Sequence, residues 1–191
     1  GAVLSGFRLE NGQTIGYFDP GSPRDKDGGG ALAFANCVLT NCQVISNLAT
    51  INGGGIAGYQ AAVVDHCTVD FNEAMEGGGV YLEGGILRSS ELRNNVADPG
   101  DGGGARIWEG ETHDCTFVRN NGYLGGGLCQ EGGGASGVIA VSNMAATGGG
   151  IAAAEALIEN AQISFNTVYQ SGGGADLEMC WLTDSVISNN N

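Results

Sequence analysis

The sequence predicts an all-β protein, a single parallel β-helix (β-solenoid) of about eight coils with about 24 residues per coil. Two observations carry this prediction. Short segments that alternate polar and apolar residues repeat along the whole chain, and no segment shows the 3.6-residue period of a helix. Glycine triplets recur with a nearly constant period, and they begin at Gly28, Gly53, Gly77, Gly102, Gly125, Gly148 and Gly172.

Composition limits the possible partners. The chain has 191 residues, a formal net charge of −14 and 36 glycines but only 3 prolines, without the Gly-X-Y period of collagen. Its length suits one domain over residues 1–191. A strongly acidic chain lacks the positive surface that nucleic acids and anionic membranes require, so we expect no nucleic-acid partner. No apolar run is long enough to span a bilayer, so we expect no membrane insertion.

Each repeat is expected to hold two recognisable strands. The first follows the glycine triplet, and its clearest copies are residues 56–59, 80–83, 105–108 and 151–154. The second ends in asparagine, and its copies are residues 42–47, 67–72, 90–95, 115–120, 138–143, 161–166 and 185–190. Residues 7–12 match the second strand with glycine at the last position. Residues 13–27 are therefore a loop insertion between the first and second coils.

Aligning these copies predicts the columns of the core. Two columns are apolar almost throughout, and a third holds small or apolar residues. The first contains Leu9, Val44, Val69, Leu92, Phe117, Ala140, Ile163 and Ile187. The second contains Leu4, Leu39, Val64, Leu87, Thr112, Ile158 and Leu182. The third contains Phe7, Cys42, Cys67, Ser90, Cys115, Val138, Ala161 and Ser185. We expect the cysteines to pack as small apolar residues, with a Cys42–Cys67 disulfide as the alternative.

The terminal asparagines of the second strand predict a structural ladder. Stacked side-chain amides can donate to one coil and accept from another, which satisfies polar groups at a buried turn. The ladder residues are Asn47, Asn72, Asn95, Asn120, Asn143, Asn166 and Asn190. The glycine triplets supply corners where φ is positive or where backbones crowd together.

Two short motifs carry a resemblance to a known family. Gly-Gly-Ala or Gly-Gly-Ile recurs at residues 29–31, 54–56, 103–105, 149–151 and 173–175, and residues 117–120 read Phe-Val-Arg-Asn. On these motifs the chain resembles right-handed parallel β-helix repeat proteins, especially the passenger repeats of polymorphic outer-membrane proteins and autotransporter adhesins. The resemblance implies right-handed winding and a location outside the cell or on its surface.

The ends and the lack of catalytic motifs shape the functional expectation. Neither end shows a recognisable capping sequence, so we expect unpaired strand edges there. We therefore expect a structural or adhesive solenoid, not an enzyme. Its partner would be a second copy stacked head to tail into a filament, or adjoining coils of a longer surface protein.

An outward strip of glutamates is a candidate site for a cation or a partner. Five acids follow the glycine triplets at similar spacing: Glu83, Glu109, Glu131, Glu155 and Glu178. Oxygen ligands suit calcium, so calcium is a possible cofactor. The alternative is a solvated acidic edge that keeps the solenoid soluble. No other cofactor is expected, and His66 and His113 are too far apart to share a zinc ion.

A mixed-charge patch supports the alternative function, a polysaccharide-binding or polysaccharide-lyase-like β-helix. Its residues are Asp65, Arg88, His113, Asp70 and Arg93. In β-helix lyases, which this patch resembles in outline, carboxylates hold calcium and an arginine abstracts a sugar proton. Arginine is a poor base unless strongly activated, and opposite charges on adjacent strands commonly pair without any ligand.

Overall fold

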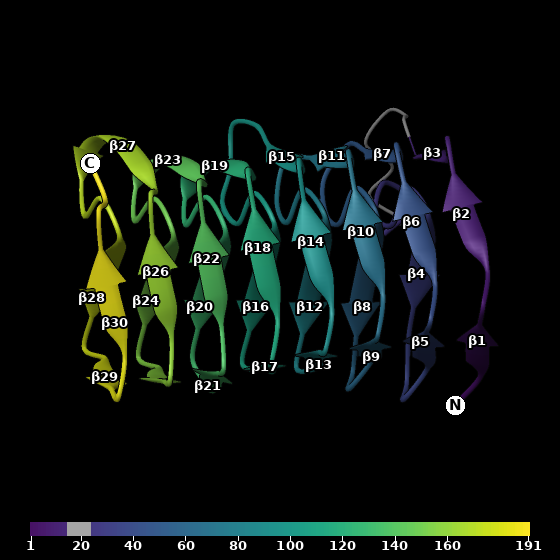
Figure 1. Cartoon of the computed structure of the whole chain (residues 1–191). Helices are drawn as coiled ribbons and strands as arrows, with labels where there is room; N and C mark the ends of the chain where they lie inside the picture. The colour runs from purple at the N-terminus through teal and green to yellow at the C-terminus, as the bar shows by residue number, and fades with distance from the viewer. Residues whose placement is uncertain (15–23) are drawn as a thin grey trace.

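The chain forms a parallel β-solenoid in which coils stack along one axis (Figure 1). The computed structural model describes residues 1–14 and 24–191. Four parallel sheets, here named A to D, run the length of the stack, with eight strands each in A and B and seven each in C and D. The solenoid therefore makes about seven complete turns, close to the predicted eight coils.

The strands are short, and each sheet takes one strand from every coil. Sheet A contains β1 (Val3–Ser5), β5 (Val38–Thr40), β9 (Val63–Asp65), β13 (Ile86–Arg88), β17 (Glu111–His113), β21 (Gly134–Ser136), β25 (Leu157–Glu159) and β29 (Trp181–Thr183). Sheet B contains β2 (Arg8–Glu10), β6 (Gln43–Ile45), β10 (Thr68–Asp70), β14 (Glu91–Arg93), β18 (Thr116–Val118), β22 (Ile139–Val141), β26 (Gln162–Ser164) and β30 (Val186–Ser188).

The other two sheets complete each coil. Sheet C contains β3 (Gln13–Thr14), β7 (Leu48–Ala49), β11 (Glu73–Ala74), β15 (Val96–Ala97), β19 (Asn121–Leu124), β23 (Met144–Thr147) and β27 (Thr167–Ser171). Sheet D contains β4 (Ala31–Ala33), β8 (Ile56–Tyr59), β12 (Val80–Glu83), β16 (Ala105–Trp108), β20 (Leu128–Glu131), β24 (Ile151–Ala154) and β28 (Ala175–Glu178).

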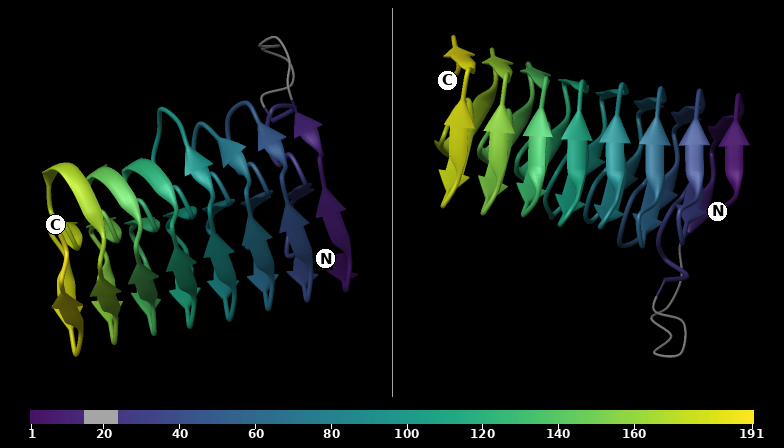
Figure 2. Two further views of the ribbon diagram at one scale, coloured as in Figure 1. Left: turned by 45° about the horizontal axis from the view of Figure 1, so that its top comes forward. Right: turned by 90° about the horizontal axis from the view of Figure 1, so that it is seen from below.

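The winding is right-handed. In Figure 1 the chain climbs in front through sheet B, crosses the top through sheet C and returns behind through sheet D while it advances to the left. The tilted view and the view from below in Figure 2 show the same regular stacking from the N-terminal to the C-terminal coil. In the part of the chain that the structure describes there is no helix, and hence none that could cross a membrane.

Each coil turns at corners where one residue adopts the left-handed backbone conformation. In the third coil these residues are His66, Phe71, Gly77 and Gly84, with φ of 50°, 55°, 58° and 65°. The first glycine of a triplet thus supplies the positive φ, as the sequence predicts. The second glycine is required by crowding, since a Cβ on Gly78 would lie 2.3 Å from the carbonyl oxygen of Val96.

The core fills the interior with the predicted columns. The side chains of Val44, Val69, Leu92 and Phe117 stack in register through sheet B and are fully buried. Leu39, Val64, Leu87 and Ile158 belong to the matching column of sheet A and are also buried. Sheet D adds a third inward face, which contains Ile56, Val80, Leu82, Ala105, Ile107, Leu128 and Ile151.

A buried polar pair interrupts this core. Gln130 of sheet D has no exposed surface, and its Oε1 accepts a hydrogen bond from Thr112 Oγ1 at 3.0 Å. Its Nε2 donates to the carbonyls of Gly110 and Gly132 at 2.9 and 2.8 Å. Every polar atom of the Gln130 side chain is therefore satisfied, which makes its burial tolerable.

The predicted insertion at 13–27 is partly described. Residues 13–14 form β3, and residues 24–27 form a turn that packs on the second and third coils. Residues 15–23 lie outside the described residues.

Candidate functional site

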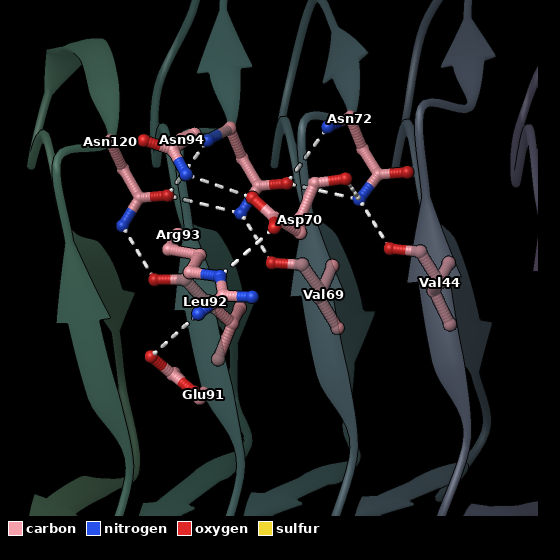
Figure 3. Close-up of polar contacts among 10 residues, drawn as sticks. Val44, Val69, Asp70, Asn72, Glu91, Leu92, Arg93, Asn94 and Asn120 are labelled. Atoms are coloured by element: carbon pink, nitrogen blue, oxygen red, sulfur yellow. Dashed lines mark hydrogen bonds and ion pairs between the residues drawn. The ribbon is translucent and has the colours of Figure 1, made fainter.

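The seven ladder asparagines form one continuous chain of hydrogen bonds between sheets B and C. In the middle of the rod, Asn72 Nδ2 donates to Asn95 Oδ1 at 3.0 Å, and Asn95 Nδ2 donates to Asn120 Oδ1 at 3.0 Å. The same pattern links Asn47 at one end to Asn190 at the other. Figure 3 shows the central part of this ladder.

The ladder also ties the backbone of neighbouring coils together. Asn95 Nδ2 donates to the carbonyl of Val69 at 3.0 Å, and Asn120 Oδ1 accepts the backbone N–H of Asn95 at 2.9 Å. The residue before each asparagine has a positive φ, which turns the asparagine side chain inward at the corner. Both the oxygen and the nitrogen of these amides are occupied within the protein. The ladder therefore supports the fold and leaves no free group for a ligand.

The five glutamates of the predicted strip occupy two neighbouring columns instead of one. Glu83, Glu131 and Glu178 end strands of sheet D, where Glu83 pairs with Trp108 and Trp108 with Glu131. Glu109 and Glu155 come one residue later, at corners with φ of 50° and 52°. Both kinds of position follow the triplet closely in sequence. Glutamates of the first kind end a strand, and those of the second kind lie at the corner where the chain turns.

Like charges directly opposite each other on adjacent strands would repel, and the two columns avoid this arrangement. In the column of Glu131, Trp108 lies in the coil on one side and Ala154 in the coil on the other. Like charges in this column are thus two strand spacings apart, roughly 9–10 Å. The column is an alternating surface of acids and other side chains, not an uninterrupted line of carboxylates.

One arginine gathers three carboxylates at this face. The Arg106 guanidinium contacts Glu76 Oε2 at 2.8 Å, Glu131 Oε2 at 3.0 Å and the carboxylate of Asp101. The three acids come from three consecutive coils. Arg106 itself lies on β16, and only 17% of its side chain is exposed. The cluster therefore cross-links the outer surface of sheet D.

Burial and charge act on this cluster in opposite directions. Burial alone would lower the pKa of Arg106, but the negative charges of Glu76, Asp101 and Glu131 raise it above its usual value. Burial raises the pKa of the Cys129 thiol to about 12, so the thiol is neutral at pH 7 and the carboxylates balance the arginine. Burial also raises the pKa of Glu76, although Arg106 opposes this.

A hollow of about 230 Å³ lies beside the arginine cluster. Its lining includes Asp176 and Glu178 together with Glu131 and Arg106, and small residues such as Ala152 contribute to the surface. Two residues of the predicted strip, Glu131 and Glu178, thus contribute to one concave acidic surface. Among residues 1–14 and 24–191, no group of three or more His, Cys, Asp or Glu side chains is arranged to hold a metal ion.

The predicted mixed-charge patch resolves into two separate ion pairs. In sheet A, Asp65 pairs with Arg88 at 3.1 Å (Oδ1 to Nε) and with the neighbouring His66 at 2.7 Å. His113 follows Arg88 in the register, but its Nδ1 contacts Ser136 Oγ at 2.9 Å. Burial disfavours the ionised form of Asp65, but hydrogen bonds from Arg88 and His66 outweigh it and lower its pKa.

The second pair lies on sheet B. Arg93 Nε donates to Asp70 Oδ2 at 2.9 Å, and Asn94 Nδ2 donates to Asp70 Oδ1 at 2.9 Å (Figure 3). The hydrogen bond and charge of Asp70 raise the pKa of Arg93. An arginine held this way is a stable cation and not a proton acceptor. The two pairs therefore lie on different sheets, A and B.

A buried cluster that the sequence analysis did not identify joins the turn at residues 24–27 to the coils. Tyr59 is buried, and its hydroxyl donates to Asp27 Oδ2 at 2.6 Å. Asn52 donates to Asp27 through its backbone and to Tyr59 through its side chain. The Arg24 guanidinium lies 3.4 Å above the centre of the Tyr59 ring, and Phe34 stacks on the same ring. Tyr59 and Phe34 are thus used for packing.

All six cysteines are free, so Cys42 and Cys67 are stacked but unbridged. Comparison of the chain with models of protein families, with curated proteins and with solved structures finds no match. The fold and the geometry above define the class of protein as a parallel β-solenoid.

Proposed function

We propose that this chain is a structural and adhesive β-solenoid that works by associating through its end faces. The observation that carries the proposal is the exposure of core columns at both ends of the stack. Ile187 belongs to the same inward column as Phe117, yet Ile187 is 46% exposed while Phe117 is fully buried. Phe7, which continues the column of Cys67 and Cys115, is 55% exposed.

Unpaired strand edges accompany these apolar faces. Strands β1 to β4 at one end, and β27 to β30 at the other, each have a neighbour in the stack on one side only. An open strand edge beside an apolar surface is a template for another strand. The added coils are those of a second copy in a head-to-tail filament, or adjoining coils of a longer polypeptide. Contacts of this kind are heterologous and extend without closing.

The finer assignment to passenger-type repeats of surface proteins belongs to the same proposal. The Gly-Gly-Ala and Gly-Gly-Ile elements lead into strands of sheet D, and Phe117 to Asn120 joins a core column to the ladder. A location outside the cell or on its surface would suit a rod that adheres. We also propose a role without catalysis, because Arg88 and Arg93, the arginines of the alternative lyase reading, are held in ion pairs.

The proposal is tested by the size and shape of the purified chain over a range of concentrations. Sedimentation velocity and negative-stain electron microscopy should show rods that lengthen in multiples of one stack as the concentration rises. Ile187→Asp places a charge on the end face and should shift the population toward single rods. Ile139→Asp is the matched control, since Ile139 is exposed on the side of sheet B. Single rods of constant length at every concentration would contradict stacking between copies.

A further inference from the structure

A second hollow, of about 270 Å³, lies on the outer surface of sheet C. Four consecutive coils contribute to it, from β15 to β27. Two tyrosines, three small residues and a proline make up most of its lining: Tyr123, Tyr169, Ala97, Gly122, Ala146 and Pro99.

The two tyrosines stand on either side of one small residue. Tyr123 lies between Gly122 and Leu124, whose partners in the next coil are Ala145 and Thr147, so Tyr123 faces Ala146. The following coil has an irregularity at this position, and Tyr169 lies there opposite Ala146. The backbones that carry the two tyrosines are therefore two strand spacings apart, roughly 9–10 Å.

Both aromatic side chains are presented to solvent while the surface between them is closed. Tyr123 is 50% exposed and Tyr169 is 66% exposed, whereas Ala146 is only 3% exposed. The floor is packed against the rod, since a Cβ on Gly122 would lie 2.8 Å from the backbone nitrogen of Gly103. The result is a shallow trough with an aromatic residue on each side.

The end wall of the trough is built by a longer turn. Between β15 and the next glycine triplet the chain has four residues, 98–101, while the preceding coil has only residues 75–76 there. This turn rises above its neighbours in Figure 1. It is joined to the trough by hydrogen bonds from Tyr123 N to the Gly100 carbonyl at 2.8 Å and from Leu124 N to Asp101 Oδ1 at 3.1 Å. The wall and Tyr123 are thus fixed relative to each other.

The chemistry of the lining indicates the class of ligand. Tyrosine combines an apolar ring face with a polar hydroxyl, and Asp98 and Asn121 add hydrogen-bonding groups at one side. A ligand that matches this lining needs apolar C–H faces together with hydroxyl groups at its edges. A saccharide has this character. The net charge of −14 and the carboxylate of Asp98 disfavour an anionic sugar.

We propose that this trough binds a neutral oligosaccharide, with a sugar ring over Ala146 between Tyr123 and Tyr169. The site adds a ligand to the solenoid and lies on its side, so it does not depend on stacking of the end faces. It is also separate from the ion pairs of Asp65 and Asp70.

The test is a binding titration of the full chain by calorimetry and by NMR of the aromatic side chains. The probes are cellohexaose, maltohexaose and N-acetylchitohexaose, with an oligogalacturonate as the anionic comparison. At least one neutral probe should bind. Tyr123→Ala and Tyr169→Ala should each weaken that binding roughly tenfold, the loss expected for one stacking contact. Tyr123→Phe keeps the ring and should retain most of the affinity.

Phe71→Ala is the matched control, because Phe71 is an exposed aromatic residue at a corner outside the trough. The Phe71→Ala variant should bind the neutral probe with the same affinity as the parent chain. The proposal is overturned if no neutral probe binds at millimolar concentration, if both alanine variants bind like the parent, or if the oligogalacturonate binds more tightly. Sedimentation of Tyr123→Ala should match the parent, which separates this result from any failure of end-to-end stacking.

Discussion

The side chain of Asn120 accepts two hydrogen bonds from Asn95, one from its backbone nitrogen at 2.9 Å and one from its side-chain amide at 3.0 Å. Asn120 also donates to the carbonyl of Leu92 at 2.9 Å. Its Nδ2 also donates to Asn143 Oδ1 at 3.1 Å. One buried amide therefore connects successive coils through four bonds at a single corner, and the arrangement repeats along the rod.

Asn120→Ala should be among the most damaging substitutions at this corner. It removes the acceptor of two buried donors and the donor to both Leu92 and Asn143, so the free energy of unfolding should fall by about 3–5 kcal/mol. Asn190→Ala, at the partly exposed end of the ladder, should cost only about 1–2 kcal/mol because water can replace the lost bonds. Urea denaturation of both variants measures the difference. Equal losses would show that the ladder does not depend on burial.

The buried pair of Thr112 and Gln130 should be coupled. Thr112→Val leaves Gln130 Oε1 without its partner and should cost about 1–2 kcal/mol. Gln130→Leu frees Thr112 and two glycine carbonyls and should cost more. The double variant should be more stable than the sum of the two losses predicts, by about 1 kcal/mol. Strict additivity in a double-mutant cycle would contradict a direct interaction.

The thiols should differ sharply in reactivity. Burial raises the pKa of Cys67 to about 11 and that of Cys115 to about 12, so few thiolates form at pH 8. Cys37 and Cys180 are only partly buried. Iodoacetamide on the native, reduced chain should modify Cys37 and Cys180 first, whereas all six cysteines should react in urea, as peptide mass spectrometry can show. Equal rates for Cys115 and Cys180 in the native chain would contradict the burial of this column.

The Asp65–Arg88 pair should contribute a small acid-sensitive part of the stability. The folded pKa of Asp65 lies below its ordinary value of 3.8, so its contribution is present above that value and is lost as the pH falls through the folded pKa. Because Arg88 is 49% exposed, the contribution should be only about 0.2–1 kcal/mol. Urea midpoints between pH 7 and pH 2 should fall less steeply for Asp65→Asn.

Arg88→Gln provides the comparison for that experiment. It removes one hydrogen-bond donor to Asp65 and keeps the carboxylate, so it should also flatten the acid limb, but His66 should preserve part of the effect. An unchanged pH profile in both variants would show that Asp65 titrates alike in the folded and unfolded chain.

The repeat made the fold and the ladder predictable, because the glycine triplet, the alternating strands and the terminal asparagine recur along the chain about once per coil. The fine register of the glutamates was not predictable, since a displacement by a single position decides whether a glutamate such as Glu109 ends a strand or occupies a corner. The Arg106 cluster joins Glu76 and Asp101, 30 and 5 residues away, across a corner whose geometry the sequence does not display.

Two other features were hidden for different physical reasons. Gln130 stands where an apolar residue is expected, and only its three bonds inside the coil explain a buried amide. The contact of Tyr59 with Asp27 depends on how an insertion folds back on the coils, which no periodic pattern encodes.

The register of the four sheets has one more consequence. Strand residues meet their equivalents in the neighbouring coils, as Thr68 meets Gln43 on one side and Glu91 on the other. Duplication or loss of a whole unit therefore joins surfaces that already match. The length of the solenoid can therefore change by genetic recombination within the repeat, and the added coils need no new core sequence.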